Sequence, residues 1–144
     1  MLRIFCLIYY EPILPFKIAP YLNKISSSSI DISDGLAQDL QHLCKESNVG
    51  AYIDLNLLPL SKKCTHLINS NKLKLKNIFS KGDDYQILFT SNKKNRSKIS
   101  VLSKKLTTKI SRIGVINKNK NIIFKYYNNK FKLKASIMGY KHIF

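Results

Sequence analysis

A chain of 144 residues can form one domain with a hydrophobic core, but it is shorter than the usual two-domain enzyme. Its apolar content of 44% fits a globular protein and argues against disorder. The formal net charge of +17 could attract nucleic acid or an anionic membrane. However, lysine outnumbers arginine by 22 to 3, and arginine is the better residue for bidentate phosphate recognition. We attribute the charge to compositional drift and do not favour a nucleic-acid partner.

The first ten residues are apolar apart from Arg3 and could be mistaken for a signal peptide or a membrane span. A span needs about 20 residues, and Glu11 follows the run without a small-residue cleavage site. The three cysteines have no C-x-x-C spacing, which supports neither a disulfide framework nor a zinc site. We therefore expect a cytoplasmic protein without a membrane partner, whose ordered domain begins near Ile25.

The segment from Ser29 to Leu40 holds three of the eight acidic residues of this basic chain. Isoleucines alternate with polar residues, as in a half-buried strand, and leucines at helical spacing follow. The pattern predicts a strand, a turn and a helix. At the turn, the oxygen atoms of Asp31, Ser33 and Asp34 suit a hydrated Mg²⁺ ion that carries phosphates. Gly35 leaves room there for a close ligand.

A more ordinary interpretation is that Ser33 or Asp34 caps the helix by accepting hydrogen bonds from its first N–H groups. A cap leaves Asp31 without a role, however. A second acidic pair, Asp83 and Asp84, stands at the mouth of another predicted strand. The first segment alone favours the helix cap, and the second acidic pair shifts the balance toward a ligand site.

The remaining predicted elements mix helices and strands without regular alternation. Helices are predicted for 34–47, with a stop at Gly50, for one short stretch within 62–80, and around Ile99, Leu102 and Leu106. Strands are predicted for 51–55, 85–90, 109–115 and 122–125, and a hairpin across Asn128-Asn129 leads to Phe131 and Leu133. We predict an α+β fold, with a mixed sheet and helices and no internal repeat.

Four stretches carry sequence motifs. They are Ile30–Leu40, similar to I-D-I-S-D-G-L-x-x-D-L; Gly50–Ser61, similar to G-x-x-I-D-x-x-x-L-P-L-S; Lys81–Thr90, similar to G-G-E-D-Y-E-L-x-F-T; and Gly139–Phe144, similar to G-Y-D-H-F. Their order and spacing resemble the C-terminal half of the thiamine-monophosphate kinases, members of the aminoimidazole ribonucleotide synthase-like superfamily. The resemblance implies the fold of the C-terminal domain of that superfamily.

This resemblance implies that the γ-phosphoryl group of ATP is transferred to thiamine monophosphate, giving thiamine diphosphate, with Mg²⁺ ions neutralising charge. It implies that Asp31 and Asp34 bind Mg²⁺ and that Ser33 contacts ATP. It further implies that Asp83 and Tyr140 contact thiamine monophosphate. Because the transfer is a direct in-line attack, the resemblance assigns no catalytic side chain to this chain.

In the family, an N-terminal ATP-binding domain supplies most of the nucleotide contacts. The resemblance therefore implies that this domain is absent here, that residues 1–24 are a remnant of the inter-domain region, and that residues 25–144 are the C-terminal domain. A truncated chain of this kind is expected to be inactive alone. Its expected partners are ATP and thiamine monophosphate when a separate N-terminal half is supplied, or a second copy in a homodimer.

Three departures from the third motif leave alternatives open. Lys81 replaces a glycine, Asp83 replaces a glutamate, and Gln86 replaces a second glutamate. The changes at Lys81 and Asp83, together with Lys141 in the closing motif, which has lost an aspartate, support the alternative of a folded, non-catalytic remnant of the enzyme. A basic nucleic-acid-binding module is a further alternative, which rests on the net charge alone.

Overall fold

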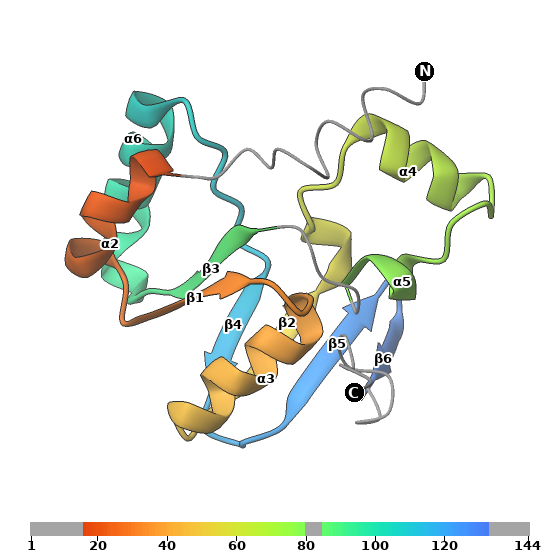
Figure 1. Ribbon diagram of the computed structural model, residues 1–144. Helices are drawn as coiled ribbons and strands as arrows, with labels where there is room; N and C mark the ends of the chain where they lie inside the picture. The colour runs from red at the N-terminus through yellow and green to blue at the C-terminus, as the bar shows by residue number, and fades with distance from the viewer. Residues whose placement is uncertain (1–15, 80–84, 133–144) are drawn as a thin grey trace, which may run out of the picture.

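A computed structural model describes residues 16–79 and 85–132 (Figure 1). The helices and short 3-10 helices (η) in these ranges are η1 (Phe16–Ile18), α2 (Ala19–Ile25), α3 (Leu36–Glu46), η2 (Leu55–Leu57), α4 (Lys62–Asn69), α5 (Leu75–Phe79), η3 (Lys93–Asn95) and α6 (Arg96–Leu106). The strands are β1 (Ser28–Ile32), β2 (Gly50–Asp54), β3 (Gln86–Thr90), β4 (Gly114–Asn117), β5 (Ile122–Tyr126) and β6 (Asn129–Phe131).

The described strands form two sheets. A four-stranded sheet has the order β4-β2-β5-β6, in which β2 runs parallel to β5 and antiparallel to β4, while β6 is antiparallel to β5. A separate two-stranded ribbon pairs β1 with β3 in antiparallel fashion. The larger sheet contains both kinds of pairing, so the predicted α+β fold with a mixed sheet is confirmed.

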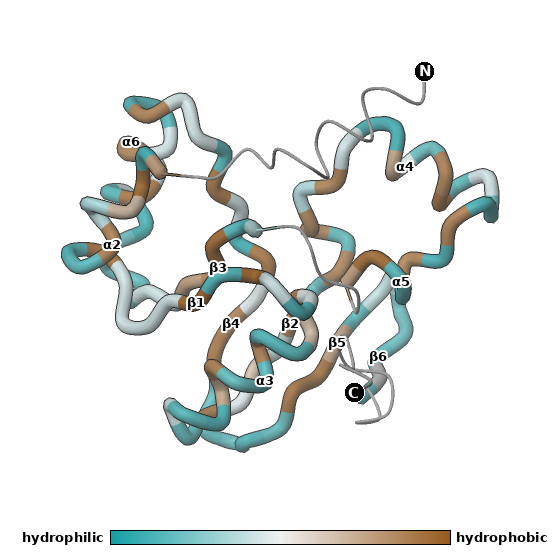
Figure 2. Tube along the Cα trace, in the orientation of Figure 1, coloured by the Kyte–Doolittle hydropathy of each residue, from teal (hydrophilic) through white to brown (hydrophobic). Residues whose placement is uncertain are grey.

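The main core cluster lies between helix α3 and one face of the four-stranded sheet. Strand β2 buries Ala51 and Ile53 on this face, because alternate residues of a strand point to the same side. The side chain of Phe124 in β5 is fully buried, and its ring stacks on that of Phe79 in α5 with 5.5 Å between the centroids. Figure 2 shows hydrophobic residues in α5 and along the first half of β5.

The second core cluster joins helices α2 and α6 to the ribbon. Ile25 of α2 and Leu102 of α6 are buried, and Ile87 and Phe89 of β3 pack against them. Leu88 lies between these two residues in β3 and packs on the main core cluster instead. Strand β3 is therefore apolar on both faces, and the ribbon lies between the α2–α6 pair and helix α3 (Figure 1).

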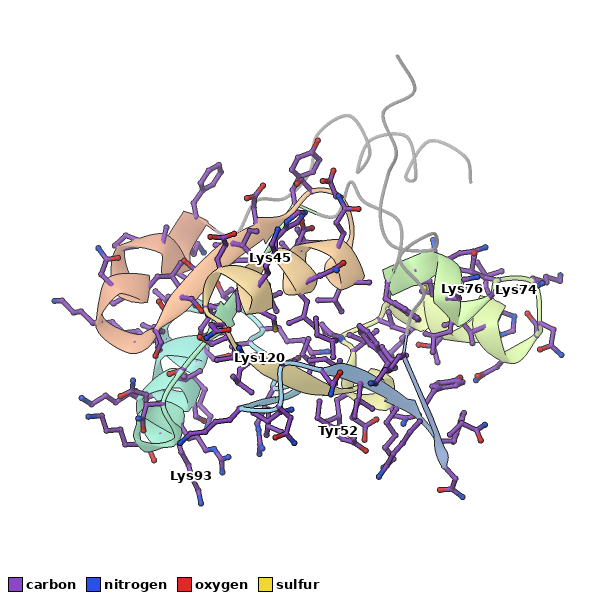
Figure 3. The ribbon with its side chains drawn as sticks, turned by 90° about the horizontal axis from the view of Figure 1, so that it is seen from below. Lys45, Tyr52, Lys74, Lys76, Lys93 and Lys120 are labelled. Carbon is purple, nitrogen blue, oxygen red and sulfur yellow. The ribbon has the colours of Figure 1, made fainter. Side chains whose placement is uncertain are left out.

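The opposite face of the four-stranded sheet carries aromatic and charged side chains. Tyr52 lies on this face, away from α3 (Figure 3). The Nζ atom of Lys130 is 5.6 Å from the centroid of the Tyr52 ring. Asp54 and Lys125 are partners in the parallel β2–β5 pair, and their Oδ2 and Nζ atoms are 3.4 Å apart. Surface ion pairs contribute about 0.2–1 kcal/mol, so the buried face supplies most of the stability of this sheet.

The predicted helix stop at Gly50 is wrong. Helix α3 ends at Glu46, and Asn48 takes the left-handed conformation with φ 53°. Asparagine tolerates this conformation better than most residues. Gly50 is instead the first residue of β2, where a Cβ atom would lie 2.5 Å from the backbone oxygen of Asn121. The glycine is required by close backbone approach.

Two other boundaries differ from the prediction. The strand predicted for 109–115 begins only at Gly114, because Ile110 packs on the second core cluster while Ile113 packs on the main one. The apolar spacing there reflects burial on two sides of a connecting segment. The stretch 62–80 contains two helices, α4 and α5, where one is predicted; the hydroxyl of Ser61 accepts a 3.1 Å hydrogen bond from the backbone N of Cys64 and caps α4.

The predicted hairpin is present as the antiparallel β5–β6 pair, in which Tyr126 faces Asn129. Leu133 lies outside the described residues. Among the helices of the described part, none has the length and apolar character needed to cross a lipid bilayer.

Candidate functional site

The predicted strand, turn and helix around the first acidic group are confirmed. Strand β1 ends at Ile32, residues 33–35 form a turn, and α3 begins at Leu36. Gly35 precedes the helix with φ 111° and ψ 146°. This conformation is adopted almost only by glycine. The backbone oxygen of Gly35 accepts hydrogen bonds from the N–H groups of Gln38 (3.0 Å) and Asp39 (3.1 Å), which starts the helix.

The pairing of β1 with β3 places residues of the first motif beside residues of the third motif. Ile32 faces Gln86 in the ribbon, and the backbone N of Tyr85 donates a 2.9 Å hydrogen bond to the oxygen of Ile32. Tyr85 has φ 46°, which is uncommon for a large non-glycine residue and is a kind of strain found at functional sites. The second acidic pair, Asp83 and Asp84, lies outside the described residues, as does Tyr140.

The side chains of the first motif differ in exposure. Asp31 and Ser33 are exposed, whereas Asp34 is half-buried. Asp31 faces Ile87 in the register of the ribbon. The Oδ2 atom of Asp34 accepts a 2.9 Å hydrogen bond from Nε2 of Gln38, and its second carboxylate oxygen is left for another ligand. Two carboxylates and a hydroxyl group thus stand at the end of one strand.

The predicted alternative, a helix cap by Ser33 or Asp34, is wrong. The capping residue is Gly35, and no side chain of the turn bonds to the first N–H groups of α3. Instead, a side chain of the helix accepts hydrogen bonds from the backbone of the turn. The Oδ2 atom of Asp39, within α3, accepts hydrogen bonds from the backbone N of Ser33 (3.1 Å) and of Asp34 (3.2 Å). The side chains of Ser33 and Asp34 are therefore not used to start the helix.

Asp39 is the residue of this site that the sequence did not single out. Only 3% of it is exposed, and its burial raises the pKa of its carboxyl group. The nearby charge of Asp34 raises this pKa further, while the hydrogen bonds from Asp34 and Ser33 lower it. The sequence did contain a signal that Asp39 is buried, since it follows Leu36 by three residues and precedes Leu43 by four, on the apolar stripe of the helix.

The donor set of the turn fits a partly hydrated divalent cation. In residues 16–79 and 85–132, no three histidine, cysteine or acidic side chains come together as a metal cluster. Mg²⁺ commonly binds through one or two carboxylates, keeps several waters and takes further oxygens from phosphates. Asp31 and Asp34 supply this number of carboxylates, so they suit a metal–phosphate complex better than a closed metal site.

Asp54, in the second motif, is held by neighbours of its own sheet. Its Oδ1 atom accepts hydrogen bonds from the backbone N (3.0 Å) and side-chain Nδ2 (2.6 Å) of Asn56, and its Oδ2 atom pairs with Lys125. The hydrogen bond from the Asn56 side chain is the main cause that lowers the pKa of this carboxyl group. Asp54 therefore fastens the end of β2, and it is not a candidate ligand residue.

Comparison with solved structures defines the fold class. Thiamine-monophosphate kinase from Stenotrophomonas maltophilia K279a superimposes with a TM-score of 0.71 at 28% identity, covering 78% of this chain and 35% of that one. A structure described as "AaThiL complexed with AMPPCP and TMP" gives 0.75 at 24% identity, over 96% of this chain and 40% of that one. E. coli HypE superimposes with a TM-score of 0.64 at 13% identity, over 81% of this chain and 38% of that one. At this identity the likeness shows the fold alone. The chain has the C-terminal domain fold of the aminoimidazole ribonucleotide synthase-like superfamily.

Comparison with characterised sequences narrows this class. No protein-family profile matches the chain. Thiamine-monophosphate kinases from two Buchnera aphidicola strains, associated with Acyrthosiphon pisum and Schizaphis graminum, are 35% and 40% identical over 121 and 124 residues. Each match covers 84% of this chain but only 37% of the relative. The chain belongs to the thiamine-monophosphate kinase family and matches the C-terminal part of its members.

Proposed function

We propose that this chain forms the C-terminal part of a thiamine-monophosphate kinase, which transfers the γ-phosphoryl group of ATP to thiamine monophosphate and gives thiamine diphosphate. One observation carries the proposal. The pairing of Ile32 with Gln86, with the hydrogen bond from Tyr85 to Ile32, brings the first and third motifs together at the end of β1. Segments far apart in sequence that meet at one strand end can contact the same ligand.

The proposal gives each motif residue a role in binding. Asp31 and Asp34 hold Mg²⁺, and the hydroxyl of Ser33 donates a hydrogen bond to a phosphate oxygen of ATP. Asp83 and Tyr140, outside the described residues, contact thiamine monophosphate. Bound Mg²⁺ supplies positive charge that neutralises and orients the phosphates. The carboxylates of Asp31, in β1, and Asp34, in the turn that follows, stand at a fixed strand end, which positions the charge for the transfer.

The rest of the active site is assigned to the part of the kinase that this chain does not match. The chain spans 37% of the length of the Buchnera relatives, and residues 31–34 contribute two carboxylates. Phosphoryl transfer depends on many positioned contacts to the nucleotide. We therefore propose that product forms only when an N-terminal part completes the site.

A reconstitution experiment tests this function. The chain is mixed with the N-terminal part of the Escherichia coli relative, ATP, Mg²⁺ and thiamine monophosphate, and thiamine diphosphate is measured. Product should form with both parts together, and the chain alone should give none. Asp31→Asn should lower the rate at least about 10-fold, by analogy with the loss of a metal-site partner. Glu46→Gln is the matched control, because it also removes one negative charge but lies at the far end of α3.

The result also separates the alternatives. If both parts are folded and mixed at high concentration without any product, the kinase proposal is contradicted and the folded, non-catalytic remnant is favoured. The substitutions Lys81, Asp83 and Gln86 in the third motif are then the first to revert to the residues of the family.

A further inference from the structure

The first turn of helix α3 holds the turn of residues 33–35, which carries Asp34, one of the two proposed metal ligands. Asp39 accepts both backbone N–H groups of Ser33 and Asp34 on a single oxygen atom, Oδ2. Gln38 donates from Nε2 to the carboxylate of Asp34. We propose that Asp39 and Gln38 are positioning residues, which set the backbone and the carboxylate of this turn for the metal ion. This inference rests on the proposed function and deepens it.

Backbone geometry explains why the turn needs an external acceptor. Ser33 and Asp34 belong to neither β1 nor α3, so their N–H groups have no partner in a strand or helix. Gly35 then turns the chain sharply at φ 111°. Asp39 lies within α3 and reaches back to both N–H groups, so the turn is fastened to a rigid element. The backbone of Asp34 is thereby held in a fixed position relative to the ribbon.

The burial of Asp39 argues that its role is specific. It lies on the apolar stripe of α3, where a hydrophobic residue would add to the core, yet it is a carboxylate with 3% exposure. A buried acid without hydrogen bonds is unfavourable. The carboxylate of Asp39 accepts its hydrogen bonds from Ser33 and Asp34 of the turn, so its place in the core is explained by that turn.

Gln38 acts on the ligand side chain itself. Its hydrogen bond occupies Oδ2 of Asp34 at 2.9 Å and so fixes the rotation of the carboxylate. The other oxygen then has a defined direction for a metal ion. Groups that orient metal ligands in this way are worth about 10- to 100-fold in metal affinity. Neither Gln38 nor Asp39 needs to touch the metal ion or the phosphates.

The test uses the full chain labelled with ¹⁵N, and Mn²⁺ alone as the probe. Paramagnetic broadening of the amide signals of residues 31–36 reports the affinity, and amide hydrogen exchange of Ser33 and Asp34 reports the hydrogen bonds. Asp39→Ala should accelerate exchange at these two amides and weaken Mn²⁺ binding about 10- to 100-fold. Asp39→Asn should restore most of the affinity, because its amide oxygen can accept both bonds.

Cys44→Ala is the matched control for general destabilisation. It removes a side chain that is buried in the same helix, at 2% exposure, without touching the turn. It should lower the thermal midpoint and leave the Mn²⁺ affinity unchanged. Gln38→Ala is the second test variant: its side chain is only half-buried, so it remains usable if Asp39→Ala does not fold. It too should weaken Mn²⁺ binding.

The outcomes distinguish failure of the positioning role of Asp39 and Gln38 from failure of the metal-binding role in the proposed function. Unchanged Mn²⁺ affinity in both Asp39→Ala and Gln38→Ala overturns the positioning role, as does unchanged affinity in Gln38→Ala when Asp39→Ala is unfolded. An equal loss in Cys44→Ala also overturns it, because the effect is then one of stability. If the wild type shows no Mn²⁺ broadening, while the Ser33 and Asp34 amides are protected and lose protection in Asp39→Ala, the metal assignment of the proposed function fails and the structural tether stands.

Discussion

Replacing Gly35 with alanine tests whether the turn before α3 is held in its observed conformation. Gly35 has φ 111° and ψ 146°, a region that side-chain-bearing residues rarely adopt. Forcing a residue into such a region costs about 1–3 kcal/mol. With a urea dependence of about 2 kcal/mol per molar for a small domain, a loss of 2 kcal/mol lowers the unfolding midpoint by about 1 M. Equilibrium unfolding in urea, followed by circular dichroism, measures this shift.

A control variant separates the effect of backbone strain at Gly35 from the effect of changing any side chain of the turn. Ser33→Ala changes an exposed residue of the same turn and should alter stability by no more than about 0.5 kcal/mol. Gly35→Ala should also accelerate amide exchange at Ser33 and Asp34, because a relaxed turn moves these groups away from Asp39. An unchanged midpoint with unchanged exchange would refute the reasoning, since alanine would then fit where we expect strain.

Three further predictions concern the core, one ion pair and the cysteines. Phe124→Ala should cost about 3–5 kcal/mol in urea unfolding, whereas Val101→Ala, at a site that is 66% exposed, should cost no more than about 0.5 kcal/mol; similar losses would contradict the assigned core. Because the folded-state pKa of Asp54 lies below its ordinary value of 3.8, its stabilising contacts are fully present above that pH and are lost as the pH falls through the folded-state pKa. Asp54→Asn should therefore lower the urea-unfolding midpoint at pH 7 but make little difference near pH 2. An equal difference at both pH values would show that ionisation of Asp54 does not stabilise the folded state. Burial raises the pKa of the Cys44 thiol, so in the folded protein a thiol reagent should label the less buried Cys64 before Cys44, as measured by peptide mass spectrometry; equal rates at these two residues would indicate that α3 opens readily.

The local elements were predictable where one physical pattern dominated. Alternation of isoleucines before Ser33 and leucine spacing after Gly35 each have a single interpretation, so β1 and α3 followed from the sequence. The stretch before Gly114 has two isoleucines, Ile110 and Ile113, which pack on different clusters, and short apolar patterns of this kind cannot be separated from a strand by sequence alone.

Long-range contacts of the site were only partly predictable. The proximity of the first and third motifs was expected from their resemblance to a family, and the bond from Tyr85 to Ile32 agrees with it in the described part. The hydrogen bonds from Ser33 and Asp34 to Asp39 depend on the path of the turn, which no residue pattern encodes. The parallel pairing of β2 with β5 likewise joins segments about 70 residues apart in the chain. The expected roles of Asp83 and Tyr140 remain predictions.

The most direct test of the account is whether one metal ion is sensed by both acidic turns. Mn²⁺ is added to the ¹⁵N-labelled wild-type chain, and paramagnetic broadening is read at the amides of residues 31–36 and of residues 82–86 in the same titration. The account predicts that both groups broaden together at the same Mn²⁺ concentration, and that Asp31→Asn weakens both effects. Broadening of one group without the other would contradict a shared site for metal and phosphate at the end of the β1–β3 ribbon.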